Sequence, residues 1–152
     1  RLKTAVLLGC SCYLGAANAG ADSETSHKMY AFAEQMGMAF QMQDDWLDTF
    51  GSKAETGKTE GGDIISKKKM WLYLKAREKE NTIDDIYTLE DPTIRVKEAR
   101  EYFKQLGLDK ELLAEQDKYY QKSLEILTSL NLEDDKMLPF LEIASFLKNR
   151  RH

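Results

Sequence analysis

Apolar residues recur every three to four positions along most of the chain, with charged residues between them. This spacing is typical of amphipathic helices, and no segment shows the strict apolar–polar alternation of a strand. Helices are therefore expected over residues 2–19, 26–50, 66–79, 82–89, 92–106 and 109–129, and from Asp134 or Pro139 to 149. The pattern predicts one all-α unit, a helical bundle covering residues 1–152.

Residues that favour helix ends agree with these ranges. Gly20 should end the first helix, because glycine commonly follows the last helical residue. Asp22 or Ser23 can cap the second helix, and Asp91 before Pro92 is a typical helix start. Gly37 lies inside the second helix, where glycine costs about 1 kcal/mol relative to alanine. Close approach of another backbone or of a ligand would explain it, and so would relaxed packing.

The first helix is apolar on nearly all sides. A helix without a polar face is expected to be buried. Its small residues, Gly9, Ser11 and Gly15, should allow neighbouring helices to approach closely. The sequence thus predicts that residues 2–19 lie in the interior of the bundle.

Composition excludes several classes of protein. The chain has 152 residues, 42% hydrophobic and 32% charged, as in ordinary soluble domains. A net charge of −4 argues against a nucleic-acid binder. Cys10 and Cys12 are two apart on a helix and cannot easily pair, so a reducing, cytoplasmic setting is expected. No apolar run reaches the roughly 18 residues of a membrane span.

The segment from Phe40 to Asp48 reads Phe-Gln-Met-Gln-Asp-Asp-Trp-Leu-Asp. On a helix, Asp44 and Asp48 stack one turn apart, with Gln41 and Asp45 close to the same face. Oxygen ligands suit a hard cation, and Mg²⁺ is usually held by one or two carboxylates together with water and phosphates. The alternative is a solvated acidic face, because the chain has 26 acidic residues. Apolar neighbours on both sides favour the metal site.

Lysines follow this acidic segment. Lys58 lies in a glycine-rich loop over residues 51–62, and Lys67, Lys68 and Lys69 come soon after it. Carboxylates repel phosphate, but Mg²⁺ can bridge the two while lysines bind the outer oxygens. The ensemble is suited to holding a diphosphate and stabilising it as a leaving group.

These motifs resemble the C-terminal half of the trans-isoprenyl diphosphate synthases, the family that makes farnesyl, geranylgeranyl and polyprenyl diphosphates. The resemblance rests on the following stretches: Lys3-Thr4-Ala5, Phe40 to Asp48, Gly57-Lys58, Gly61-Gly62-Asp63-Ile64 and Lys68. It covers residues 1 to about 72 and implies the helical isoprenoid synthase fold. It also implies a homodimer that condenses an allylic diphosphate with isopentenyl diphosphate.

Site roles come from the same resemblance. Asp44, Asp45 and Asp48 match the second Asp-rich motif of the family and would bind Mg²⁺. Phe40 would line the cavity beside isopentenyl diphosphate.

The remaining roles concern the allylic substrate. Lys3, Lys58 and Lys68 would contact its diphosphate. Thr4 and Gln41 would turn their oxygens toward the carbocation formed when the diphosphate leaves.

One family feature is missing. The first Asp-rich motif and the basic residues upstream of it do not occur in the sequence. We therefore expect a fragment of a longer synthase, with no condensation activity of its own and weak Mg²⁺-dependent diphosphate binding. Two alternatives are a non-catalytic helical partner subunit and a terpene cyclase of similar fold.

Overall fold

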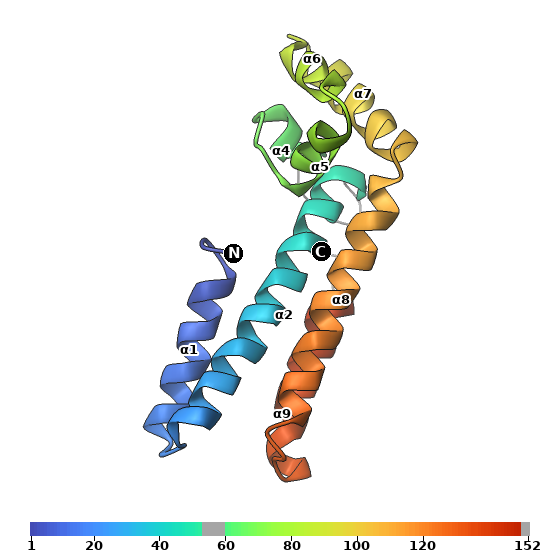
Figure 1. The fold of residues 1–152 in the computed structure, drawn as a ribbon. Coiled ribbons are helices and arrows are strands. Elements are labelled where there is room, and N and C mark those ends of the chain that lie inside the picture. The colour runs from blue at the N-terminus through green and yellow to red at the C-terminus, as the bar shows by residue number, and fades with distance from the viewer. Residues whose placement is uncertain (53–59, 150–152) are drawn as a thin grey trace. The chain divides into compact units, whose positions relative to one another are not determined.

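The computed structural model describes residues 1–52 and 60–149, and in these ranges it contains helices and no strand (Figure 1). The all-α prediction is confirmed. The helices are α1 (Ala5–Asn18), α2 (Ser23–Phe50), α4 (Gly62–Ile65), α5 (Trp71–Lys79), α6 (Thr82–Thr88), α7 (Pro92–Gln105), α8 (Leu108–Thr128) and α9 (Asp134–Asn149). None of the helices in these ranges is long and apolar enough to cross a membrane.

The chain forms two compact units. The first contains Arg1–Gln41 and residues 115–149, and the second contains Met42–Ala114. Helices α2 and α8 each begin in one unit and end in the other. Helices α1 and α9, of 14 and 16 residues, belong to the first unit, and helices α4 to α7, of 4 to 14 residues, belong to the second.

The core of the first unit follows the predicted periodicity of α2. Its buried members on that helix are Met29, Phe32, Ala33 and Met36, spaced three, four and seven residues apart. Leu127 of α8 and Ala144 of α9 complete the cluster. The ring of Phe32 meets that of Phe140 edge to face, with 6.0 Å between centroids.

Two glycines allow α1 to lie close against α2. A Cβ at Gly37 would stand 2.7 Å from the Cα of Ala5, so another backbone does approach this glycine. A Cβ at Gly9 would stand 2.8 Å from the ring of Tyr30. The same prediction is wrong for Gly15, since no atom of another described element lies within 4 Å of its Cβ position.

The predicted burial of the first helix is also wrong. The helix begins at Ala5, and its buried residues are Ala5 and Gly9 alone. Leu7 is 68% and Leu14 59% exposed. In the described structure α1 packs through one side only, although its sequence is apolar on nearly every side.

Helix α5 begins at Trp71, later than the predicted residue 66. Ser66 ends α4, and Lys67 adopts a left-handed backbone conformation with φ of 52°. A left-handed residue interrupts a right-handed helix. The three lysines at 67–69 therefore lie before the helix and do not form its first turn.

The start of α7 agrees with the sequence. The carboxylate of Asp91 accepts hydrogen bonds from the backbone N–H groups of Thr93 at 2.8 Å and Ile94 at 3.2 Å. Pro92 occupies the first helical position. The predicted cap is confirmed, and it fixes where the longest helix that lies wholly in the second unit begins.

Candidate functional site

Three carboxylates lie on the last two turns of α2. Asp45 is buried, at 7% exposed, while Asp44 and Asp48 are half-buried. Burial is the main reason that the pKa of Asp48 lies above its usual range, and the negative charges of Asp63 and Asp44 raise it further. The positive charge of Lys68 and a hydrogen bond from the backbone of Asp63 act in the opposite direction. The predicted acidic face is therefore not freely solvated.

Asp48 holds the turn that leads into α4. Its Oδ2 accepts a hydrogen bond from the Asp63 N–H at 2.9 Å, and its backbone carbonyl accepts one from the Gly61 N–H at 2.8 Å. Gly61 has φ of +67°, and a Cβ there would stand 2.7 Å from a methyl of Val96. Both the backbone conformation and the close contact require glycine. The Gly-Gly-Asp sequence thus has a structural reason.

Lys68 joins the acidic cluster through Asp63. Its ammonium group forms an ion pair with the Asp63 carboxylate, and its backbone N–H donates to the Asp63 carbonyl at 2.9 Å. The hydrogen bond and charge of Asp63 raise the pKa of Lys68, with smaller contributions from Asp48 and Asp45. The side chain is 58% exposed, so an anionic ligand can reach it. The structure therefore brings one predicted lysine to the predicted carboxylates.

The other predicted site residues belong to the first unit. The Thr4 hydroxyl donates a hydrogen bond to the Gln41 Oε1 at 3.0 Å, and both side chains are half-buried. Phe40 is half-buried, and Lys3 is exposed in the turn before α1. Lys58 lies outside the described residues.

The donor set fits Mg²⁺ as a site completed by its ligand. Among the residues that the structure describes, no three His, Cys, Asp or Glu side chains converge as a closed metal centre would require. Mg²⁺ does not need such a centre, since it retains water and takes oxygen ligands from bound phosphates. Asp44 and Asp48 lie one turn apart on α2, and the negative charge of Asp44 contributes to the raised pKa of Asp48. They could hold Mg²⁺ when a diphosphate supplies further oxygens.

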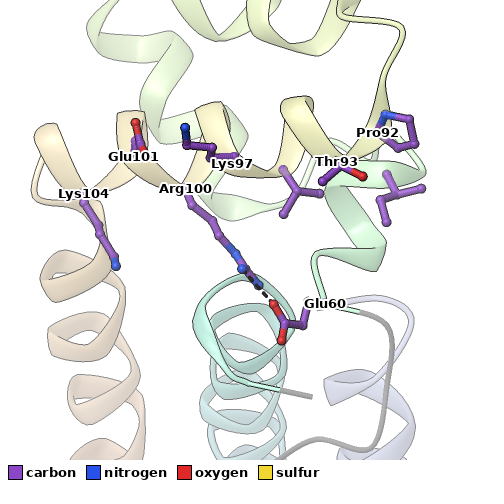
Figure 2. Close-up of a pocket in the computed structure, with 9 residues that line it drawn as sticks. Glu60, Pro92, Thr93, Lys97, Arg100, Glu101 and Lys104 are labelled. Atoms are coloured by element: carbon purple, nitrogen blue, oxygen red, sulfur yellow. Dashed lines mark hydrogen bonds and ion pairs between the residues drawn. The ribbon is translucent and has the colours of Figure 1, made fainter. Parts of the chain in front are cut away.

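Arg100 was not predicted, and it supports the end of the helix that carries the carboxylates. Its Nε donates to the Thr49 carbonyl, and its Nη1 lies 3.0 Å from the Glu60 Oε2, an ion pair drawn in Figure 2. A cation at the carboxyl end of a helix is favourable. The side chain crosses a surface cavity of about 520 Å³ beside α7 (Figure 2).

The chain is similar to known proteins of one family. The family model described as polyprenyl synthetase matches residues 1–106. Heptaprenyl diphosphate synthase component 2 of Geobacillus stearothermophilus is 43% identical over 65 residues, which are 43% of this chain and 20% of that protein. Geranylgeranyl pyrophosphate synthase 6 of Arabidopsis thaliana is 27% identical over 150 residues, 99% of this chain and 34% of that protein.

Solved structures show the fold over nearly the whole chain. A geranylgeranyl pyrophosphate synthase crystal structure is 31% identical, with a TM-score of 0.85 over 99% of this chain and 49% of its own. A polyprenyl synthetase from Streptomyces coelicolor A3(2) has a TM-score of 0.87, covers 95% of this chain and 46% of its own, and is 24% identical. The chain thus spans about half the length of these structures and less of the curated relatives.

The helices are those of the isoprenoid synthase fold, as predicted. The chain belongs to the polyprenyl synthetase family, because the family model covers more than half of it.

Proposed function

We propose that this chain carries the allylic-diphosphate site of a trans-isoprenyl diphosphate synthase. The whole protein would condense an allylic diphosphate with isopentenyl diphosphate. The observation that carries the proposal is the carboxylate cluster of Asp44, Asp45 and Asp48. Lys68 is connected to this cluster through Asp63, which forms an ion pair with Lys68 and a hydrogen bond with Asp48. An acidic helix end and an accessible lysine are the two parts that a metal-bound diphosphate requires.

In this proposal the aspartates bind the metal and the lysines bind the diphosphate. Mg²⁺, when bound, neutralises charge on the diphosphate and stabilises it as it leaves. Asp44, Asp45 and Asp48 would hold the metal. Lys68 would bind the outer oxygens as a point charge. We propose the same contact for two further lysines, Lys3 and Lys58.

Thr4 and Gln41 would orient and stabilise the allylic part of the substrate. The hydrogen bond between them fixes both side chains and leaves oxygen lone pairs on each. Such dipoles favour a nearby carbocation, whereas a full negative charge would risk capturing it. Phe40 would exclude water beside isopentenyl diphosphate.

A thermal-shift experiment tests the proposal. Inorganic diphosphate with Mg²⁺ should raise the unfolding temperature of the chain, because a ligand that binds only the folded state stabilises it. Asp44→Ala should abolish the shift. Asp134→Ala, which removes a carboxylate from the first turn of α9, is the matched control and should keep it. If the chain were a helical partner subunit without a diphosphate site, neither the unsubstituted chain nor either variant would show a shift.

Cytoplasmic location and homodimer formation are proposed together with this activity. Analytical ultracentrifugation of the chain, with a full-length relative as the reference, tests whether it forms a homodimer. A monomer at micromolar concentration would contradict it.

A further inference from the structure

Arg95 of α7 is a buried arginine, 5% exposed, with an unusual set of partners. Its Nε donates to the Leu89 carbonyl at 2.9 Å, Nη1 to the Ile65 carbonyl at 3.0 Å, and Nη2 to the Glu90 carbonyl at 3.2 Å. In the part of the chain that the structure describes, its hydrogen-bond partners are all backbone oxygens. The guanidinium therefore connects two backbone segments and forms no ion pair with a carboxylate of the described residues.

Stability alone explains such a residue poorly. Removing an arginine from water is costly, and well-packed apolar residues are often as stabilising as buried charged residues of similar volume. A guanidinium does offer five donors in a fixed fork, which can hold several carbonyls in one geometry. The partners of Arg95 thus point to a role in fixing backbone position.

One of the two connected segments is α4, which is a single turn. A helix of this length is not stable by itself, since nucleation is unfavourable. Its first residues are bound to α2 through Asp48, as described above. Its last residue, Ile65, is bound by Arg95. Gly61 also contacts Val96, the next residue along α7. The short turn is therefore held from both ends.

The same turn carries the groups that reach the proposed ligand. Asp63 is inside α4, and Lys68 is bound to it through both backbone and side chain. Only two residues separate Ile65 from Lys68 in sequence. A shift of the Ile65 carbonyl would therefore move the Lys68 ammonium relative to Asp45 and Asp48.

We propose that Arg95 is a positioning residue for diphosphate binding: it binds the Ile65 carbonyl and so holds the α4 turn in the geometry that places Lys68 at the carboxylate cluster. Arg95 does not touch the ligand and acts through Lys68. The inference rests on the proposed function, although its effect on α4 can be measured without a ligand.

Calorimetry well below the unfolding temperature provides the binding test, with inorganic diphosphate and Mg²⁺ as the probe. Arg95→Met keeps an unbranched apolar stem in place of the aliphatic part of the side chain and removes its donors, and Arg95→Lys is the second variant if the first folds poorly. Either should weaken diphosphate binding by about fivefold to tenfold, the equivalent of one hydrogen-bonded contact. Phe103→Leu, a substitution at a fully buried position on the same helix, is the control and should leave the affinity within about twofold.

A double-mutant cycle separates positioning from general destabilisation. In the Lys68→Ala background, Arg95→Met should weaken diphosphate binding no further, because its route to the ligand is gone. An additional loss of the same size in that background would overturn the proposal.

Hydrogen exchange at the Asp63 amide gives a readout without ligand. This N–H is bonded to Asp48, so Arg95→Met should lower its protection from exchange while the core amides of α2 keep theirs. Unchanged protection together with unchanged affinity overturns the role of Arg95. If the unsubstituted chain fails to bind Mg²⁺-diphosphate, the proposed function falls, and the exchange experiment still decides whether Arg95 holds the turn.

Discussion

Both units bury apolar side chains, and Ile64, Leu72 and Phe103 of the second unit are fully buried, but helices of the second unit are in addition tied at their ends by polar side chains. The Met29–Met36 stripe of α2 exemplifies the first arrangement. Arg95, which binds three backbone carbonyls, exemplifies the second. The carboxylate cluster and Lys68 both lie in the second unit.

The difference has a physical meaning for function. The hydrophobic effect is non-directional, whereas a hydrogen bond weakens steeply when its distance or angle leaves the preferred range. A site that must present carboxylates and an ammonium group to one ligand benefits from directional contacts. Substitutions in the two units should therefore have different consequences.

The largest effect on stability is expected at the helix contact of the first unit. Gly37→Ala should destabilise the chain by about 1–3 kcal/mol, because the new Cβ would overlap the backbone of Ala5. Gly15→Ala is the matched control within the same helix pair. Its Cβ meets nothing, so it should stabilise the chain by up to about 1 kcal/mol. Urea unfolding of both variants checks the pair, and equal effects would contradict the packing described here.

The next largest effect on stability is expected at the N-terminal cap of α7. Asp91→Ala removes the acceptor for the Thr93 and Ile94 N–H groups and should cost about 1 kcal/mol. Asp91→Asn keeps an acceptor oxygen and should restore most of that loss. Chemical unfolding measures both, and a neutral Asp91→Ala would show that the second unit does not depend on this cap.

Asp48 is expected to show opposite effects on stability and binding. Because burial raises its pKa, the folded chain holds this proton to higher pH than the unfolded chain does. Stability is therefore lost as the pH rises from the usual aspartate pKa through the raised value. Asp48→Asn should remove that loss and be more stable than the unsubstituted chain at neutral pH, while diphosphate binding disappears. Unfolding curves at pH 4 and pH 7 test this, and a variant less stable at pH 7 would refute it.

The smallest effect is expected at an exposed ion pair of the first unit. The ammonium of Lys148 lies 2.7 Å from the Asp117 carboxylate, and their hydrogen bond is the main reason that the pKa of Asp117 lies below its usual range. The stability it provides is present above the usual aspartate pKa and is lost as the pH falls through the lowered value. Both side chains are well exposed, so Asp117→Asn should remove only a few tenths of a kcal/mol at neutral pH. Thermal unfolding of the unsubstituted chain and of Asp117→Asn between pH 2 and pH 7 measures this difference in stability.

Periodicity and local chemistry predicted much of the molecule. The buried stripe of α2, the close backbone contact at Gly37 and the Asp91 cap each follow from residues near in sequence. The acidic face of α2 was also predictable, since Asp44 and Asp48 share it by helical geometry.

Other features depend on contacts that have no local signature. Leu7 and Leu14 are exposed because other helices cover only part of α1 in the described structure. A helix that is apolar on nearly every side gives no indication of which side will be covered. Arg95 reaches a carbonyl thirty positions away, at Ile65. Because any residue supplies a carbonyl, no pattern of side chains predicts that bond. The ion pair of Asp63 with Lys68 was missed for a related reason, since it depends on the left-handed turn at Lys67.

The most direct test of the account is calorimetric titration of the chain with inorganic diphosphate, with and without Mg²⁺, beside Asp44→Asn. We predict binding by the unsubstituted chain only when Mg²⁺ is present, and no binding by Asp44→Asn in either condition. Equal binding without the metal, or full affinity in Asp44→Asn, would contradict the claim that these aspartates hold a metal-bound diphosphate.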